Sequence, residues 1–305
     1  MTVSSQIQSP SVSQSFSVSR SSSVSQSPRG SEPASQPGNI AFEVPRFSAT
    51  ASQLVDELNG ASPTVPIVVQ LIECEPTISS LILRLANSPI YGATRAITSI
   101  AHAIVVLGFR SVAQQAIATA TGALFTDPHA PCFDARQQTY IESLGVAAAA
   151  RFIARATNAC SPDEAFLCGV IHDVGKLILL QHAGDEYAAL LAGHPQGVPL
   201  EKEIELFGIS HADLGRECCV VWSLPTQLGN AVAEHHGLIS EVTDPLSRTL
   251  ILATYLARKW QLGFIENSLV ENEVLETELS AFQNDAMFNQ CREQFKMIRE
   301  ICLEA

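Results

Sequence analysis

A histidine and an aspartate lie side by side at residues 172 and 173, and they open the densest set of potential metal ligands in the chain. Gly175-Lys176 follows directly, His211 lies further on, and the pair His235-His236 completes the set. Imidazole and carboxylate groups together suit Zn, Mn, Fe or Ni, and a His-Asp dipeptide at a helix end can aim both groups at one ion. The candidate metal ligands are therefore His172, Asp173, His211, His235 and His236.

The segment before the His-Asp pair has the pattern of a helix start. Ser161 is suited to the N-cap, Pro162 to the first helical position, and Glu164 to closing a capping box. The predicted helix continues through Val170 and ends at His172-Asp173. The pair is thus expected at a junction between two helices.

Two further predicted helices carry the other histidines. Positions 211, 215, 218 and 222 share one face of the first helix, which ends at Ser223-Leu224-Pro225. Positions 228, 231, 232 and 235 line one face of the second helix, with Gly237 as its C-cap. Because such faces are usually buried, we expect Cys218, Trp222 and His235 in the core, and His236 at the surface.

Most of the remaining chain also has helical periodicity. From Phe42 onward, apolar residues recur with helical spacing between Pro and Gly residues, and 97–125 and 135–157 are two such stretches. The small residues of 145–150 permit close helix packing. The sequence therefore predicts a nearly all-helical domain.

The N-terminal segment differs in composition. Residues 1–40 are dominated by Ser with Gln and Pro, which predicts a disordered tail because too little apolar surface is available to offset the entropy of ordering. A transit peptide is the alternative, although Arg20 and Arg29 are the only basic residues in this segment.

Charge and cysteine usage limit the environment and the partners. Eighteen basic and 31 acidic residues give a net charge of -13, which disfavours nucleic acid and anionic lipid as partners. No apolar run approaches the roughly 20 residues of a membrane-spanning helix. The eight cysteines form no C-x-x-C pair and are expected to be free thiols. We predict a cytoplasmic protein, outside the membrane, whose partner is another protein.

A series of motifs resembles one protein family. The segment 170–176 resembles the signature of the HD superfamily of metal-dependent phosphohydrolases, and residues 44–260 resemble its HDOD subfamily. The motifs that carry the resemblance, besides this signature, are Leu83-Arg84-Leu85-Ala86-Asn87-Ser88, Tyr91-Gly92, Ile97-Thr98-Ser99-Ile100, Val106-Leu107-Gly108, Leu206-Phe207-Gly208, Trp222-Ser223-Leu224-Pro225 and Glu234-His235-His236.

The resemblance implies an all-α, multi-helix bundle in which an N-terminal helical subdomain packs on an HD-like helical subdomain. We place the HDOD domain at 41–262, with its two subdomains at 41–130 and 131–262. Residues 263–305 are then a C-terminal helical extension.

The resemblance also assigns the outer metal ligands. Catalytic members of the superfamily hold metal with a histidine on an earlier helix, the His-Asp pair, and an aspartate on a later helix. Glu142 stands at the first of these positions and Thr254 at the last. Glu142 could still bind a hard cation, but the neutral hydroxyl of Thr254 is a poor ligand for a divalent ion. We therefore expect no metal, no cofactor and no catalytic residue; the alternative is Mn, Fe or Ni at a partial HD site.

Without a metal ion, the His-Asp pair would be a structural junction. His172 would donate a ring N–H to Asp173 or Glu142, and Lys176 would neutralise nearby carboxylates in a buried polar network.

Three functions are compatible with this sequence. The resemblance implies a non-catalytic bacterial signal-transduction module that acts through protein–protein interaction. The alternatives are a phosphodiesterase acting on a nucleotide or cyclic dinucleotide, and a sensor that binds a small nucleotide without turnover. A cyclic-dinucleotide phosphodiesterase of this superfamily would carry Gly-Tyr-Pro after the His-Asp pair, and this sequence has no such tripeptide. The altered outer ligands favour the signalling module over the hydrolase.

Overall fold

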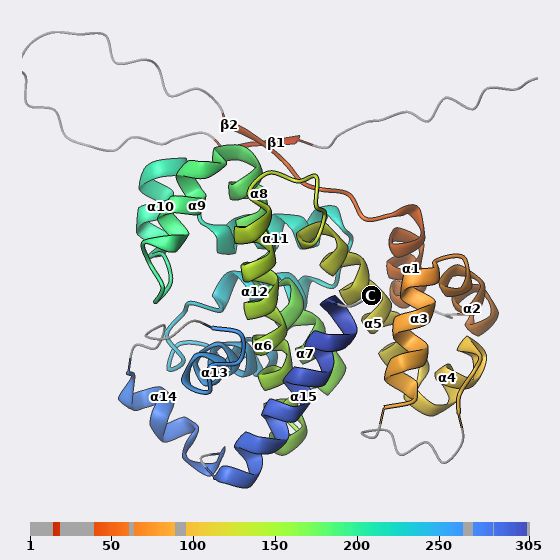
Figure 1. Ribbon diagram of the computed structural model, residues 1–305. Coiled ribbons are helices and arrows are strands. Elements are labelled where there is room, and N and C mark those ends of the chain that lie inside the picture. Colours follow the sequence, from red (N-terminus) through yellow and green to blue (C-terminus); the bar gives the residue numbers. More distant parts are fainter. Residues whose placement is uncertain are drawn as a thin grey trace, which may run out of the picture.

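The chain folds as an all-α multi-helix bundle, as the sequence predicts (Figure 1). In the computed structural model, the described residues are 15–18, 40–60, 64–88, 96–264, 271–282 and 284–303. Most of the predicted tail and the motif Tyr91-Gly92 lie outside these residues. The strand β1 (Ser15–Val18) lies inside the tail that the sequence predicts to be disordered, and it pairs antiparallel with β2 (Ile40–Glu43), where the predicted domain begins, with Ser15 opposite Glu43.

The N-terminal helices form a separate group on one side of the molecule (Figure 1). They are α1 (Ala49–Asn59), α2 (Val65–Glu73), α3 (Pro76–Ala86), α4 (Ile100–Leu107) and α5 (Phe109–Phe125). The predicted helical stretch 97–125 is thus divided in two at Gly108, whose φ of 90° lies in a region that side chains disfavour. Helix α3 ends at Ala86, with Asn87 as its C-cap.

The second group of helices contains the candidate ligands. It consists of α6 (Phe133–Thr157), α7 (Pro162–Ile171), α8 (Val174–Ala183), α9 (Asp185–Ala192), α10 (Leu200–Phe207), α11 (His211–Val221), α12 (Thr226–Glu234) and α13 (Pro245–Lys259). The C-terminal segment follows with α14 (Glu273–Glu278), a 3-10 turn (Ser280–Phe282) and α15 (Asp285–Leu303). Helix α15 packs on α6 and also contacts α3 (Figure 1).

Two hydrophobic cores correspond to the two groups of helices. The smaller core contains Ile72, Ile82 and Ile104, and the larger contains Leu144, Leu167 and Leu177. Helix α5 joins them, because its Val112 lies in the smaller core and its Phe125 in the larger.

Two glycines allow helices around the His-Asp junction to approach closely. A Cβ atom added at Gly169 would lie 2.4 Å from Cα of Ala147, so α7 and α6 touch through their backbones, as the small residues of α6 predict. A Cβ atom at Gly175 would lie 1.9 Å from the carbonyl oxygen of His211. The contact at Gly175 places α8 directly against the start of α11, which brings Asp173 and His211 together.

The helices around the junction form one long apolar stretch. Residues Pro162–Ala183 are long and apolar enough to cross a membrane by length and composition, and 89% of their most apolar window is buried inside the protein. Two bent helix pairs, Val65–Ala86 and Ile100–Phe125, pass the same test only when each pair is taken together. Burial in the bundle accounts for the apolar character of α7 and α8.

Candidate functional site

Helix ends place the candidate ligands. Ser161 caps α7 and accepts a hydrogen bond from the backbone N–H of Glu164, as predicted. His172 is the C-cap of α7, and Asp173 is the N-cap of α8. His211 is the first residue of α11.

The last two histidines follow α12, which ends earlier than expected. Gly237 is not its C-cap; the helix ends at Glu234 and His235 occupies the cap. Because the chain leaves the helix at this point, the rings of His235 and His236 both reach His211. Cys218 and Trp222 are buried, and His235 is 3% exposed while His236 is exposed, as the sequence predicts.

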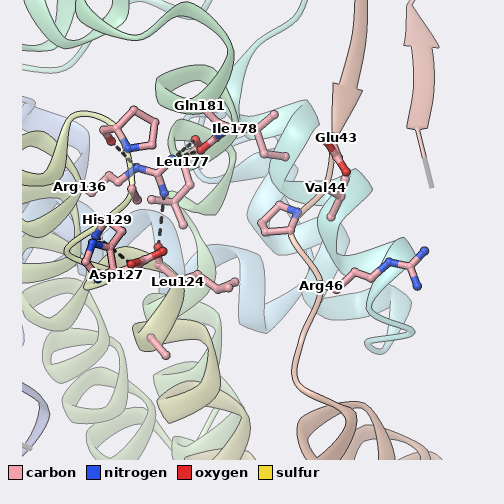
Figure 2. A pocket seen from close by; sticks show the side chains of 14 residues that line it. Glu43, Val44, Arg46, Leu124, Asp127, His129, Arg136, Leu177, Ile178 and Gln181 are labelled. Atoms are coloured by element: carbon pink, nitrogen blue, oxygen red, sulfur yellow. Dashed lines mark hydrogen bonds between the residues drawn. The ribbon is translucent and has the colours of Figure 1, made fainter. Parts of the chain in front are cut away.

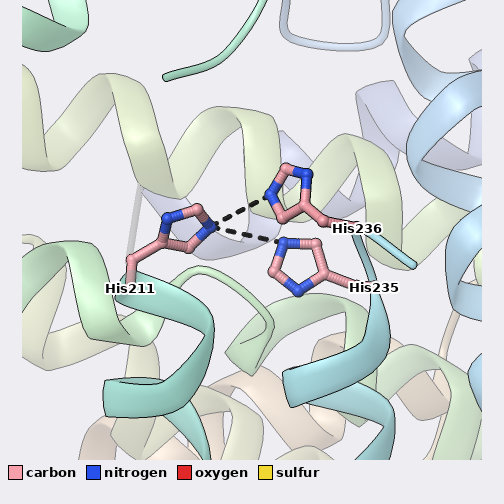
Figure 3. Close-up of side chains that lie close together, drawn as sticks. All are labelled: His211, His235 and His236. Carbon is pink, nitrogen blue, oxygen red and sulfur yellow. Dashed lines mark hydrogen bonds between the residues drawn. The ribbon is translucent and has the colours of Figure 1, made fainter. Parts of the chain in front are cut away.

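The imidazoles of His211, His235 and His236 converge on one point (Figure 3). The Nε2 atom of His211 lies 3.4 Å from Nε2 of His235 and 3.1 Å from Nε2 of His236. The carboxylate Oδ1 of Asp173 lies 3.4 Å from Nε2 of His211 and 3.8 Å from Nε2 of His235. Ligands of a tetrahedral ion with bonds of about 2.0–2.1 Å stand roughly 3.3 Å apart, so the three imidazoles have a spacing that suits one transition-metal ion. Asp173 lies beside this group and also forms a second potential ligand group with His172 and His235.

The other ring nitrogens define which atoms point at this centre. Nδ1 of His211 lies 2.7 Å from a carboxylate oxygen of Glu203, and Nδ1 of His235 lies 2.6 Å from the carbonyl oxygen of Val232. Only acceptors stand opposite these nitrogens, so each Nδ1 carries a proton that it donates and each ring turns its Nε2 to the centre. Oδ1 of Asp173 is buried and has no hydrogen-bond partner among the described residues. Several acceptors therefore face one another, and a cation at the centre would satisfy them all.

A buried carboxylate supports His211 from behind. Glu203 in α10 is fully buried and accepts hydrogen bonds from the backbone N–H and the Nδ1–H of His211, both at 2.7 Å. Its other oxygen accepts one from the hydroxyl of Tyr187 at 2.6 Å. Burial opposes the charge of Glu203, but these bonds outweigh it and lower the pKa of the carboxylate. Metal-binding histidines commonly have such a carboxylate partner.

The second oxygen of Asp173 has different neighbours. Nζ of Lys176 lies 2.7 Å from Oδ2, and Nε2 of His172 lies 3.2 Å from it. Nδ1 of His172 lies 2.8 Å from the carbonyl oxygen of Gly169, so this ring also directs Nε2 inward. Lys176 neutralises Asp173 as expected. Burial opposes the charge of Asp173, but His172, Lys176 and His211 hold its pKa well below the usual range.

The two outer positions of the HD ligand set carry different groups. Glu142 is half-buried and accepts a hydrogen bond at 3.0 Å from the amide of Gln138. Burial raises the pKa of Glu142 against the opposing influence of Lys176. The hydroxyl of Thr254 donates to the carbonyl oxygen of Leu250 at 3.0 Å, within its own helix. A complete HD centre would have an imidazole at the position of Glu142 and a carboxylate at the position of Thr254. This chain has neither at its expected place.

Sequence reasoning did not identify Glu203, Tyr187 or Arg258 as parts of this region. Glu203 is one of several glutamates in α10, and nothing in its spacing marks it as the buried one. Tyr187 reaches Glu203 from α9, sixteen residues earlier in the chain. Their proximity depends on how α9 and α10 pack, which local sequence patterns do not specify.

A cavity separate from the histidine cluster lies beneath the extended segment that follows β2 (Figure 2). It has a volume of about 710 Å³. Its buried Arg136 bonds to the carbonyl oxygens of Pro131 and Leu124 and to the side chain of Gln181, and Arg46 extends away from it (Figure 2). The guanidinium of Arg136 thus ties together three segments of the fold.

Comparison with known proteins identifies the family. The HDOD domain model matches residues 44–238, which is more than half of the chain. The chain belongs to the HDOD domain family. Its fold is similar to that of an HDOD domain protein of unknown function from Geobacter sulfurreducens, with a TM-score of 0.67, 23% identity, and coverage of 85% of this chain and 93% of that one.

Two further structures share the HDOD-like fold. A Shewanella amazonensis SB2B protein, provisionally assigned as a phosphohydrolase, has a TM-score of 0.65 and 23% identity, covering 85% of this chain and 94% of that one. A Marinobacter aquaeolei VT8 protein, provisionally assigned to signal transduction, has a TM-score of 0.59 and 20% identity, covering 85% of this chain and 57% of that one.

A curated relative is also similar in sequence. An uncharacterised protein of Treponema pallidum is 20% identical over 221 residues, which is 71% of this chain. The HDOD chain spans about two-fifths of that relative, 42% of its length.

Proposed function

We propose that this HDOD protein is a signal-transduction domain that holds one divalent metal ion and does not hydrolyse phosphate esters. The observation that carries the proposal is the convergence of the Nε2 atoms of His211, His235 and His236 beside the unpartnered Oδ1 of Asp173. Three imidazoles and one carboxylate are a donor set that suits Zn, Mn, Fe or Ni. The expectation of no metal, drawn from the outer positions, is untested, and this convergence favours its alternative.

The other half of the site, around Oδ2 of Asp173, Lys176 and Thr254, supports a role without hydrolysis. The ammonium of Lys176, 2.7 Å from Oδ2 of Asp173, repels a second cation at that oxygen. Thr254 offers only a neutral hydroxyl, and that hydroxyl already donates to Leu250. A second ion at Oδ2 of Asp173 would therefore lack both the surrounding negative charge and the ligands that it needs. With one ion among the imidazoles, the centre can join α8, α11 and the end of α12, while the position that the outer ligands would complete stays without an ion.

Similarity to an HDOD-like signalling protein and the acidic net charge of the chain support the signalling role. The provisional assignment of the Marinobacter relative is to signal transduction. A net charge of -13 favours a protein partner over nucleic acid. We further propose that this action takes place in the cytoplasm, through contact with a protein partner.

Metal analysis combined with an activity screen tests the proposal. Protein loaded with Mn²⁺, Fe²⁺ or Ni²⁺ and then dialysed is expected to hold one ion per chain. It should not hydrolyse bis(p-nitrophenyl) phosphate or a cyclic dinucleotide. Turnover that rises with metal content would contradict the non-hydrolytic role, and metal-free protein after every loading would contradict the metal centre.

Matched histidine variants locate the ion. His235→Ala and His236→Ala should each lose stoichiometric metal, because each removes one of four donors. His129→Ala, which changes an exposed histidine outside the cluster, should keep it. Equal metal content in all three variants would place the ion elsewhere.

A further inference from the structure

The cavity beneath the extended segment after β2 is large enough for a small organic molecule. Its volume of about 710 Å³ lies within the range of roughly 300–1,000 Å³ found for pockets that bury drug-sized ligands. It lies between residues 43–46 and three other parts of the fold, namely the end of α5, residues 127–131 with the start of α6, and α8 (Figure 2). None of its lining residues belongs to the histidine cluster, so the cavity is separate from the proposed metal centre.

The wall of this cavity is apolar over more than half of its lining residues. Val44 follows β2, Leu124 stands at the end of α5, and Leu177 and Ile178 come from α8. Val44, Leu177 and Ile178 are themselves buried. Because these side chains come from different segments, they would enclose an apolar body on several sides, and its removal from water would favour binding.

One charged side chain is buried in this wall, and its hydrogen-bond partners are all neutral. Arg136 is 5% exposed. Among the described residues, its guanidinium donates to the carbonyl oxygens of Pro131, Leu124 and Leu177 and to the amide oxygen of Gln181. A buried charge is normally paired with an opposite charge, so an anion is the partner that Arg136 lacks.

The hydrogen bonds of Arg136 leave donors for such an anion. A guanidinium has five N–H groups, and four bonds are formed here, which leaves one N–H group of Nη1 without an acceptor in the described part of the chain. The bonds to Leu124 and Leu177, at 3.4 and 3.5 Å, are longer than the usual N–H···O distance of about 2.7–3.2 Å. Burial lowers the pKa of Arg136 against the opposing influence of Cys132 and Asp127, so these groups do not offset the cost of burying its charge.

The other charged side chains of the cavity limit the charge of a ligand. Glu43 and Asp127 also line it and are exposed, and Asp127 accepts a hydrogen bond from the backbone N–H of His129 at 2.9 Å. Arg46 is exposed and extends away from the cavity (Figure 2). A dianionic phosphate ester would therefore face two carboxylates with one buried guanidinium to balance it. A ligand with a single negative charge is favoured.

We propose that this cavity binds a hydrophobic monocarboxylic acid, with its carboxylate on Arg136 and its apolar body against the side chains of α5 and α8. The planar guanidinium matches a carboxylate in shape and charge. The protein would then receive a small-molecule signal at a site separate from the histidine cluster. This site does not depend on the proposed metal ion.

Calorimetric titration of the full chain with decanoate, below the concentration at which decanoate forms micelles, tests the proposal. Decanoate should bind. Its uncharged analogue 1-decanol and acetate, which has the charge without the apolar body, should each bind at least about tenfold more weakly, because each lacks one of the two interactions. Equal affinity for decanoate and 1-decanol, or no binding of decanoate, would overturn the proposal.

Two arginine variants test which side chain holds the carboxylate. Arg136→Gln should weaken decanoate binding at least about tenfold, because it removes the charged donor. Arg46→Gln changes the arginine that lines the same cavity but extends away from it, and should bind decanoate like the wild type. Equal affinity in the two variants would contradict a carboxylate site at Arg136.

A pair of cavity-filling variants tests the site without changing Arg136, which also ties three segments of the fold together. Ala123→Phe fills the cavity from α5 and should weaken decanoate binding at least about tenfold by excluding the apolar body. Ala159→Phe, at an exposed alanine between α6 and α7, is the matched control and should bind decanoate like the wild type. Unchanged decanoate affinity in Ala123→Phe would overturn the proposed site even if Arg136→Gln does not fold.

Discussion

Glu203 accepts two hydrogen bonds from His211, one from its backbone N–H and one from its Nδ1–H, each at 2.7 Å. The pair fixes both the start of α11 and the tautomer of the ring. Because Nδ1 donates to Glu203, Nε2 of His211 faces the point toward which the Nε2 atoms of His235 and His236 also lie. A fully buried glutamate in α10 thus prepares a nitrogen ligand in α11.

Removing the charge of Glu203 should therefore weaken metal binding without removing a ligand. Glu203→Gln is expected to lower affinity for the ion by about 10–100-fold, the usual cost of losing a partner behind a metal-binding histidine. Tyr187→Phe, which removes one hydrogen bond to Glu203, should have a smaller effect in the same direction. Competition titration of Mn²⁺ or Zn²⁺ against a chromogenic chelator measures both.

The matched control for this series is Glu201→Gln. Glu201 lies in the same helix, two residues away, but is exposed. Its variant should bind metal like the wild type. If Glu201→Gln and Glu203→Gln weaken binding equally, the effect comes from net charge and not from the contact with His211.

Restoring the two outer ligands should create a second metal position. Glu142→His with Thr254→Asp supplies the imidazole and carboxylate that complete HD centres use. We expect metal content to rise from one to two ions per chain, with hydrolysis of bis(p-nitrophenyl) phosphate appearing only in the double variant. Metal content that stays at one ion would mean that the backbone around α6 and α13, and not the ligands alone, has departed from a hydrolase.

Local patterns in the sequence predict much of this site, but they do not predict the buried residues that hold its histidines in place. The N-cap at Ser161 and the helical face that starts at His211 are set by neighbouring residues, and both are confirmed. The C-cap of α12, whose position brings His235 and His236 inward, was predicted two residues too late, at Gly237 and not at His235, because Gly237 is the stronger local stop signal. The role of Glu203 depends on tertiary packing and leaves no periodic signal.

Close backbone contact at Gly175 should make this position intolerant of any side chain. A Cβ atom there would lie 1.9 Å from the carbonyl oxygen of His211, and backbone atoms cannot move aside as a flexible side chain can. Gly175→Ala is expected to lower the free energy of unfolding by about 1–3 kcal/mol, the usual cost of overpacking. Urea denaturation followed by circular dichroism measures the change.

Gly193→Ala is the control for Gly175→Ala. Gly193 has a helical φ of -76°, and its nearest contact for an added Cβ is 3.4 Å away. This variant should unfold within about 0.5 kcal/mol of the wild type, as substitutions outside such contacts do. Because Gly→Ala restricts the unfolded chain and by itself favours folding, a similar loss in both variants would contradict a cost specific to the contact of α8 with α11.

The stability of the metal-free protein should fall as the pH drops from 7 to 5. Burial, together with the nearby His236 and His172, holds the pKa of His235 well below its ordinary value. The folded state therefore keeps this ring neutral, whereas the unfolded chain takes up a proton below a pH of about 6.5. Because the unfolded state binds more protons, stability is fully present above that pH and is lost below it, by up to about 1.4 kcal/mol per pH unit for this group.

Asp173 does not contribute in this window. Its pKa is also lowered in the fold, so its stabilising effect is present above a pH of about 3.9 and is lost only at lower pH. Urea denaturation at pH 7, 6 and 5 separates the two groups. His235→Gln should reduce the dependence on pH over this range, because the glutamine side chain does not titrate. An unchanged slope in that variant would show that other groups, and not the buried ring of His235, make the metal-free protein sensitive to acid.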